Sequence, residues 1–137
     1  MEMVAKEMLP VMIRALDSKK GRDIQALYTA DQTTLADYFI ICTGTSSTQI
    51  KALADAVEEV MEQCGERPHH IEGHRGGQWT LMDYSCVVVH IFTEEAREFY
   101  SLERLWSDAV PVDISPYLFP NADIRVRNAR KEREEDL

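Results

Sequence analysis

The sequence has few of the features that mark a disulfide-bonded, zinc-binding or membrane-spanning protein. Its three cysteines, Cys42, Cys64 and Cys86, are an odd number and form no Cys-x-x-Cys pair. A disulfide framework or a zinc ribbon needs paired cysteines, so neither is expected. The longest apolar run is far shorter than a membrane span, and no signal-peptide pattern opens the chain. We therefore expect reduced thiols and a cytoplasmic protein with no membrane contact.

Positive charge is also scarce. The chain has 15 lysines and arginines against 24 aspartates and glutamates, which gives a formal net charge of −9 at pH 7. Because phosphates are bound by Lys and Arg, we expect little direct nucleic-acid contact. A basic protein partner suits this charge better, since opposite fields speed the encounter of two molecules.

No phosphate-binding motif is present, neither Gly-x-x-x-x-Gly-Lys-[Ser/Thr] nor Gly-x-Gly-x-x-Gly. The turn at Gly44–Ser46 joins a predicted strand to a predicted helix, where free N–H groups can hold a phosphate, although a capped helix is the commoner outcome. A glycine and a serine at such a junction are also typical of nucleotidyltransferases, which need an acidic pair on the next strand to hold a divalent metal. Here the acidic residues that follow lie on the helix instead: Asp55, Glu58 and Glu59.

The remaining candidates for chemistry are histidines. His69, His70 and His74, with Glu72, match neither His-Glu-x-x-His nor a zinc finger in their spacing. We therefore predict no catalytic residue, no metal site and no cofactor. A nucleotide-binding or nucleotidyltransferase-like enzyme is the alternative, and it would bind a nucleotide with magnesium near Gly44.

Hydrophobic periodicity predicts the order helix, strand, strand, helix, strand, strand, helix. The predicted elements span residues 8–20, 23–28, 36–43, 47–64, 79–83, 86–92 and 94–106. Pro10 is expected in the first turn of its helix, and the loop over 66–76 has room for a short strand around Ile71. This order predicts an α/β fold, a mixed sheet with helices packed on it. We expect one domain over residues 1–111, followed by a C-terminal extension over 112–137 that is partly irregular or frayed.

The hairpin over residues 77–92 is the centre of this prediction. Alternation on its first arm places Trp79, Leu81 and Asp83 on one face and Tyr84 on the other. The second arm is apolar almost throughout, which is typical of a central strand covered on both faces. His90 lies inside this arm and is predicted to be a hydrogen-bonded core residue rather than a catalytic base.

Four ordered segments resemble one known family, the ribosomal silencing factors, also called RsfS or Iojap. The resemblance covers roughly residues 8–109, and it rests on residues 37–49, 79–84, 87–92 and 97–106. The family usually has an acidic residue just before the run Val87–His90, where this chain has Cys86. The resemblance implies a nucleotidyltransferase-like topology that lacks the catalytic acids.

The resemblance also implies a function that is not enzymatic. Such a factor binds large-subunit ribosomal protein fourteen on the face of the large ribosomal subunit that meets the small subunit. It thereby blocks subunit association and represses translation under nutrient limitation. The partners expected for this chain are therefore the large ribosomal subunit and its protein fourteen.

The partner contact is predicted to involve large side chains and one carboxylate. Aromatic residues are common anchors of protein interfaces, and an exposed carboxylate can face a Lys or Arg of a basic partner. Trp106 has an alternative role as core that holds the hairpin in place. A self-associating structural module, a homodimer of the free protein paired through an open sheet edge, is a further alternative. The predicted contact residues are Trp79, Leu81, Asp83, Tyr84, Tyr100 and Trp106.

Overall fold

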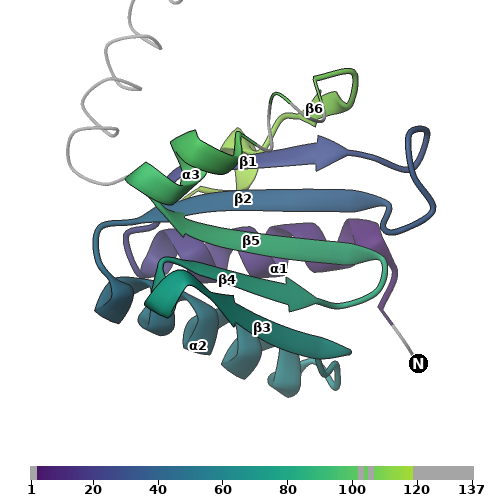
Figure 1. The fold of residues 1–137 in the computed structure, drawn as a ribbon. Helices are drawn as coiled ribbons and strands as arrows, with labels where there is room; N and C mark the ends of the chain where they lie inside the picture. Colours follow the sequence, from purple (N-terminus) through teal and green to yellow (C-terminus); the bar gives the residue numbers. More distant parts are fainter. Residues whose placement is uncertain (1–2, 102–103, 105–106, 119–137) are drawn as a thin grey trace, which may run out of the picture.

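The computed structural model describes residues 3–101, 104 and 107–118, apart from the side chain of residue 75. Within these ranges the chain alternates helices and strands much as predicted (Figure 1). The helices and 3-10 turns are α1 (Ala5–Ser18), α2 (Ser47–Gln63), η1 (Arg75–Gly77), α3 (Glu94–Tyr100) and η2 (Ser115–Tyr117). The strands are β1 (Arg22–Tyr28), β2 (Tyr38–Gly44), β3 (His70–His74), β4 (Trp79–Asp83), β5 (Val87–Thr93) and β6 (Val110–Val112).

The strands form one mixed sheet in the order β3-β4-β5-β2-β1-β6. The central pair, β2 and β5, is parallel, and the other neighbouring pairs are antiparallel. A parallel pair needs a long crossover, which here contains α2 and the β3–β4 hairpin. The predicted mixed α/β fold is therefore confirmed.

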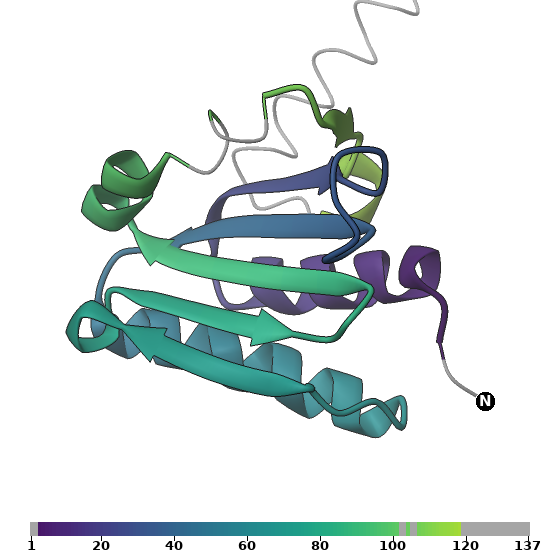
Figure 2. The same ribbon diagram turned by 45° about the vertical axis from the view of Figure 1, so that its right-hand side comes forward.

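Helices cover the two faces of the sheet unequally. Figures 1 and 2 show α1 and α2 side by side on one face, while α3 lies at one end of the opposite face. Ile40 and Val89 point toward α1 and α2, whereas the next residue along β2, Ile41, packs with Phe92 and Ala96 on the α3 side. Because β2 and β5 are buried on both faces, the prediction of a central apolar strand over the second hairpin arm is confirmed.

The structure differs from the sequence prediction at the start of α1. The helix begins at Ala5, so Pro10 lies inside it rather than in its first turn. A proline there removes one helical hydrogen bond. The apolar face of α1 offsets this cost, since Met12, Ile13 and Leu16 are completely buried against the sheet and α2.

The short strand that was allowed for around Ile71 is present as β3. One strand and one helix end differ from the prediction. β6 was not predicted, and Pro111 at its centre argues locally against a strand. The proline is tolerated because β6 is the last strand of the sheet and pairs only with β1. The helix predicted over 94–106 ends at Tyr100, because Ser101 adopts a left-handed conformation with φ 47°.

The segment after β6 continues to pack against the rest of the molecule. Ile114 is buried in the core beneath α1, and Tyr117 and Leu118 pack against the same cluster. The guanidinium of Arg14 lies 6.0 Å from the centre of the Tyr117 ring. The proposed division into a domain over 1–111 and an extension over 112–137 stays a prediction, and residues 119–137 lie outside the described part.

The cysteines are free thiols. Burial raises the pKa of Cys42 to about 12, so this thiol stays protonated and unreactive. Cys86, which stands where the resembled family usually has an acid, is half-buried and lies 3.6 Å from the sulfur of Met8 on α1. Its side chain therefore belongs to the helix-covered side of the sheet.

Candidate functional site

The sheet face opposite α1 and α2 brings together most of the predicted contact residues. Strand pairing across β3, β4 and β5 aligns residues in three cross-strand triplets on this face. Trp79, Leu81 and Asp83 share the face, as alternation along β4 predicts. The triplets are His74–Trp79–Phe92, Glu72–Leu81–His90 and His70–Asp83–Val88.

Trp79 is the centre of an aromatic group on this face. Its ring centroid lies 5.0 Å from Phe92, 4.5 Å from Tyr100 and 4.7 Å from His74. The side chain is half-buried, so one part of the indole packs on the sheet while another part reaches the surface. An aromatic ring held in this way is a preformed anchor, because little side-chain entropy remains to be lost on binding.

His90 lies beside this aromatic group on the same face, with its ring centroid 6.0 Å from those of Trp79 and Phe92. Its Nδ1 accepts a 3.3 Å hydrogen bond from the indole N–H of Trp79, and its ring packs edge-on against Phe39. Burial lowers the pKa of His90 to about 4, so the ring is neutral at physiological pH. The predicted role as a hydrogen-bonded core residue is confirmed. The neutral ring must carry its proton on Nε2, and this buried atom has no hydrogen-bond partner among the described residues.

Helix α3 adds two aromatic residues beside Trp79. Tyr100, a predicted contact residue, is half-buried against Trp79 and Phe92. Phe99 is 68% exposed, and its ring centroid lies 5.2 Å from that of Tyr100. Phe99 is not among the contact residues predicted from the sequence. Its adjacency to Tyr100 was the available signal, since two neighbouring helical residues cannot both face the sheet.

Asp83 has both a structural and a surface role. Its Oδ1 accepts a 2.7 Å hydrogen bond from the N–H of Ser85, which stabilises the turn where Ser85 has φ 69°. Its Oδ2 lies 3.6 Å from Nδ1 of His70. Leu81, next on this face, is half-buried against the cluster that contains Phe39. Asp83 and Leu81 therefore extend the aromatic surface with one carboxylate and one apolar side chain.

One predicted contact residue is not brought to this surface, and another cannot be compared with the prediction. Tyr84 is only 5% exposed and packs in the core on the α1 and α2 side, as alternation implies, so its assignment to the contact surface is corrected. Burial, with a smaller contribution from the charge of Glu58, raises the pKa of Tyr84 to about 12. Trp106 lies outside the described residues.

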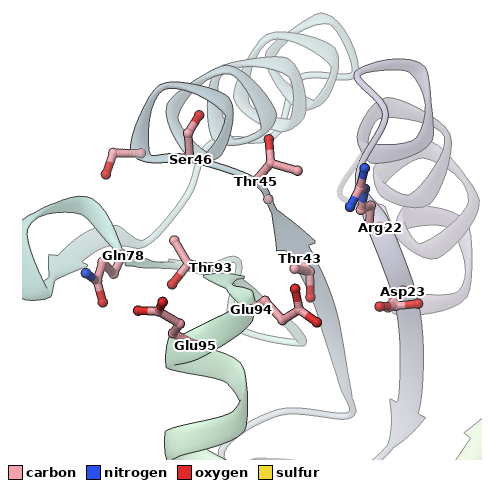
Figure 3. A pocket seen from close by; sticks show the side chains of 11 residues that line it. Arg22, Asp23, Thr43, Thr45, Ser46, Gln78, Thr93, Glu94 and Glu95 are labelled. Carbon is pink, nitrogen blue, oxygen red and sulfur yellow. The ribbon is translucent and has the colours of Figure 1, made fainter.

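A pocket of about 440 Å³ opens where β2 and β5 end and α2 and α3 begin (Figure 3). It contains the Gly44–Ser46 turn, which was considered for phosphate binding. The N–H of Thr45 and the Oγ of Ser46 are already engaged by the side chain and backbone of Gln49. The ionisable side chains that line the pocket are Arg22, Asp23, Glu94 and Glu95. Three carboxylates around one arginine disfavour a phosphate group.

Metal binding and membrane insertion gain no support from the described residues. Within them, no group of three or more His, Cys, Asp or Glu side chains is arranged to hold a metal ion. Among the helices that the structure describes, none combines the length and apolar character that a membrane crossing requires.

Comparison with known proteins yields one family. A sequence model of the family described as "Ribosomal silencing factor during starvation" matches residues 2–136. The ribosomal silencing factor RsfS of Halalkalibacterium halodurans is 36% identical over 109 residues, which are 80% of this chain and 93% of the relative. The murine protein named "Mitochondrial assembly of ribosomal large subunit protein 1" is 29% identical over 106 residues, 75% of this chain and 46% of the relative.

A solved structure is similar in both sequence and fold. An X-ray structure of a Chromobacterium violaceum protein superimposes with a TM-score of 0.74 at 38% sequence identity. The alignment covers 77% of this chain and 88% of the other. The mixed sheet with its helices is thus an architecture that an experimentally determined relative shares.

Proposed function

The chain belongs to the ribosomal silencing factor family, and from this premise we propose that it binds the large ribosomal subunit through protein fourteen. The family has a regulatory rather than an enzymatic role. Bound at the joining face, the protein would block association with the small subunit and repress translation under nutrient limitation. We place this action in the cytoplasm.

The observation that carries the proposal is the half-buried Trp79 on the sheet face that α1 and α2 leave open. Around it stand an exposed Phe99, a half-buried Tyr100 and a half-buried Leu81. A cluster of aromatic and aliphatic side chains with a polar rim is the usual composition of a protein interface centre. We name Trp79, Leu81, Asp83, Phe99 and Tyr100 the docking surface.

Charge supports a basic partner for the docking surface. The whole chain carries a net charge of −9, and Asp83 contributes a carboxylate that is partly accessible. Opposite charges increase the rate of association and help to select among partners. A ribosomal protein embedded among RNA phosphates is a basic partner of this kind.

The mechanism is steric occlusion, which requires affinity and position but no chemical step. A protein held on the joining face would occupy volume that the small subunit needs. The pocket beside Gly44 has no part in this mechanism. Calorimetric titration of the protein with nucleotide and magnesium tests the enzymatic alternative, since a defined stoichiometry would support nucleotide binding in that pocket.

Cosedimentation with purified large ribosomal subunits tests the proposal. The variant combines Phe99→Ala with Asp83→Asn, because Phe99 is exposed and asparagine retains the oxygen that caps the Ser85 turn. The matched control combines Val110→Ala at the edge strand β6 with Glu59→Gln on α2, away from the docking surface. We expect the variant to bind about 30-fold more weakly and the control to bind normally.

The same variants should be compared in subunit joining, followed by sedimentation of the joined ribosome. The wild type and the control should reduce joining, and the Phe99→Ala, Asp83→Asn variant should not. Equal binding by all three proteins would contradict the assigned surface. Failure of the wild type to bind large subunits would contradict the proposed function itself.

We further propose that the free protein pairs with a second copy through β3. This strand ends the sheet at the side opposite β6, and its outer edge has no neighbouring strand among the described residues. Edge strands of this kind can pair across a two-fold axis. Light scattering of the purified protein would give twice the monomer mass, and a monomer mass at high concentration would contradict this pairing.

A further inference from the structure

Three side chains of β3 and one of β4 form a connected group of acids and imidazoles. Nε2 of His70 lies 2.9 Å from Oε1 of Glu72, and Nε2 of His74 lies 3.1 Å from Oε2 of the same carboxylate. On the other side, Nδ1 of His70 lies 3.6 Å from Oδ2 of Asp83. Glu72 thus bridges two histidines, and one of them also reaches Asp83. We call these four residues the acid–imidazole row.

The row arises from strand geometry. Residues 70, 72 and 74 alternate along β3, so their side chains share one face, and pairing with β4 places Asp83 opposite His70. The spacing matches no zinc motif, and this arrangement becomes apparent only when the register between β3 and β4 is known.

The acid–imidazole row shares one residue with the docking surface and contacts it at a second. The shared residue is Asp83. The ring of His74 packs on the indole of Trp79, with centroids 4.7 Å apart. A change of charge in the row therefore acts on the carboxylate and the aromatic anchor that we assign to the partner contact.

The charge of the row depends on its two imidazoles. With both rings neutral, the row carries the two negative charges of Glu72 and Asp83, and with both rings protonated its net charge is zero. Histidine is the side chain that ordinarily changes charge near neutral pH. The side chains of the row are solvent-accessible, with 45% exposure for His70, 40% for His74 and 47% for Glu72. Protons therefore reach both rings freely.

Other titratable groups near the row do not reverse this change in net charge, from two negative charges toward zero. His69 precedes β3, and its ring lies 6.2 Å from that of His70. A proton on His69 would add further positive charge at low pH and act in the same sense. His90, next across β4, is buried with its pKa lowered to about 4, so it stays neutral where exposed histidines titrate. The described charged groups that lie within ion-pair distance of the two imidazoles are Glu72 and Asp83 themselves.

We propose that the acid–imidazole row is the part of the docking surface that receives Lys or Arg side chains of the partner, and that His70 and His74 make this contact pH-dependent. When the histidines are neutral, both carboxylates are available to cations of the partner. When the histidines are protonated, they pair with Glu72 and Asp83 and compete with those cations. This inference rests on the proposed function, because it names the regulation of the same surface.

The expected direction is weaker binding at lower pH. Exposed ion pairs each change an equilibrium by a factor of about 1.4 to 5. Two such contacts multiply to binding that is about twofold to 25-fold weaker at pH 5.8 than at pH 7.8. Added salt should reduce the difference, since it screens exposed charges.

The test measures binding of the protein to purified large ribosomal subunits at pH 5.8 and pH 7.8. The variant is His70→Gln with His74→Gln, which keeps polar side chains but cannot titrate. The matched control is His69→Gln, which removes a neighbouring exposed imidazole outside the row. Circular dichroism at both pH values checks that all three proteins remain folded.

We expect the wild type and the His69→Gln control to lose affinity at pH 5.8, and the double variant to lose clearly less. Titration of the partner affects all three proteins equally and cancels in the comparison. Equal losses for the wild type and the double variant would overturn this inference and leave the proposed function intact. Absence of binding by every protein at both pH values would overturn both.

Discussion

The indole N–H of Trp79 donates a hydrogen bond to Nδ1 of His90, and the two residues lie on adjacent strands of the same sheet face. The bond fixes the tautomer of a buried imidazole and the orientation of a half-exposed indole at the same time. The ring centroid of the indole lies 5.0 Å from that of Phe92, which stacks on it, and 4.5 Å from that of Tyr100. Core packing and the docking surface are therefore parts of one aromatic group.

The buried His90 should make folding stability depend on pH. Its pKa is about 4 in the folded protein against 6.5 for the free side chain, so the unfolded state takes up a proton first as the pH falls. The contribution is fully present above about pH 6.5 and is lost as the pH falls toward 4. The shift corresponds to about 3 kcal/mol. Urea unfolding at pH 7.5 and pH 4.5 measures the resulting difference in the free energy of unfolding.

A variant without the imidazole isolates this effect from the titration of carboxylates. His90→Gln retains an acceptor for the indole N–H of Trp79 but cannot take up a proton. Its free energy of unfolding should fall less between pH 7.5 and pH 4.5 than that of the wild type. Parallel pH profiles for the two proteins would show that His90 is not the buried group responsible.

Arg97 should hold α3 on the sheet. Its Nη1 donates 2.7 Å hydrogen bonds to the carbonyl oxygen of Asp23 and to the hydroxyl of Thr43. Arg97→Met should lower the free energy of unfolding by about 1–3 kcal/mol, because two acceptors lose a charged donor. Hydrogen exchange of the α3 amides should become faster. Arg104→Met, at an exposed position, is the control and should leave both measurements unchanged.

Ile114 should contribute to stability although it lies beyond the predicted domain end at residue 111. Its side chain is buried beneath α1, so Ile114→Ala leaves a cavity and should cost about 2–3 kcal/mol in urea unfolding. Val110→Ala removes an aliphatic side chain that is 57% exposed and should cost less than about 0.5 kcal/mol. If both substitutions changed the free energy of unfolding by the same small amount, the segment after β6 would contribute nothing to the core.

Gly44 should be intolerant of any side chain. A Cβ atom there would lie 2.9 Å from Cγ1 of Ile50 and 3.3 Å from Cδ1 of Leu53, both on the buried face of α2. Gly44→Ala should therefore lower the thermal midpoint, with a cost of about 1–3 kcal/mol. Gly73→Ala is the matched control, because nothing lies within 4 Å of its Cβ position. A stable Gly44→Ala protein would contradict this packing.

Local sequence patterns predict much of this molecule because its main elements follow simple periodicity. The alternation along β4 correctly separates Trp79 from Tyr84, since side-chain direction in a strand depends only on the count of residues. The start of α3 follows a local pattern in the same way, since Thr93 is a common capping residue and its hydroxyl accepts the N–H of Ala96. The selection of Tyr84 as a contact nevertheless failed, because it relied on residue type and not on the face that alternation assigned.

Features that depend on distant partners could not be predicted in this way. β6 forms because it pairs with the outer edge of β1, a strand distant in the sequence. A local pattern does not predict this pairing, since a proline such as Pro111 disfavours a strand. The end of α3 is set by the left-handed conformation of Ser101, a serine that propensity alone would allow within the helix. The acid–imidazole row requires the register of β3 on β4, which no single strand contains.

The parallel pairing of β2 with β5 has a consequence for synthesis of the chain. Tyr38 pairs with Val87, so the loop that this contact closes contains α2, β3 and β4. While β5 is still inside the exit tunnel, β2 has left it with β1 as its only neighbour. The nascent chain thus presents a largely apolar strand, every residue of which is buried in the finished fold, with one unpaired edge. Such a state is prone to aggregation until the second half of the protein emerges.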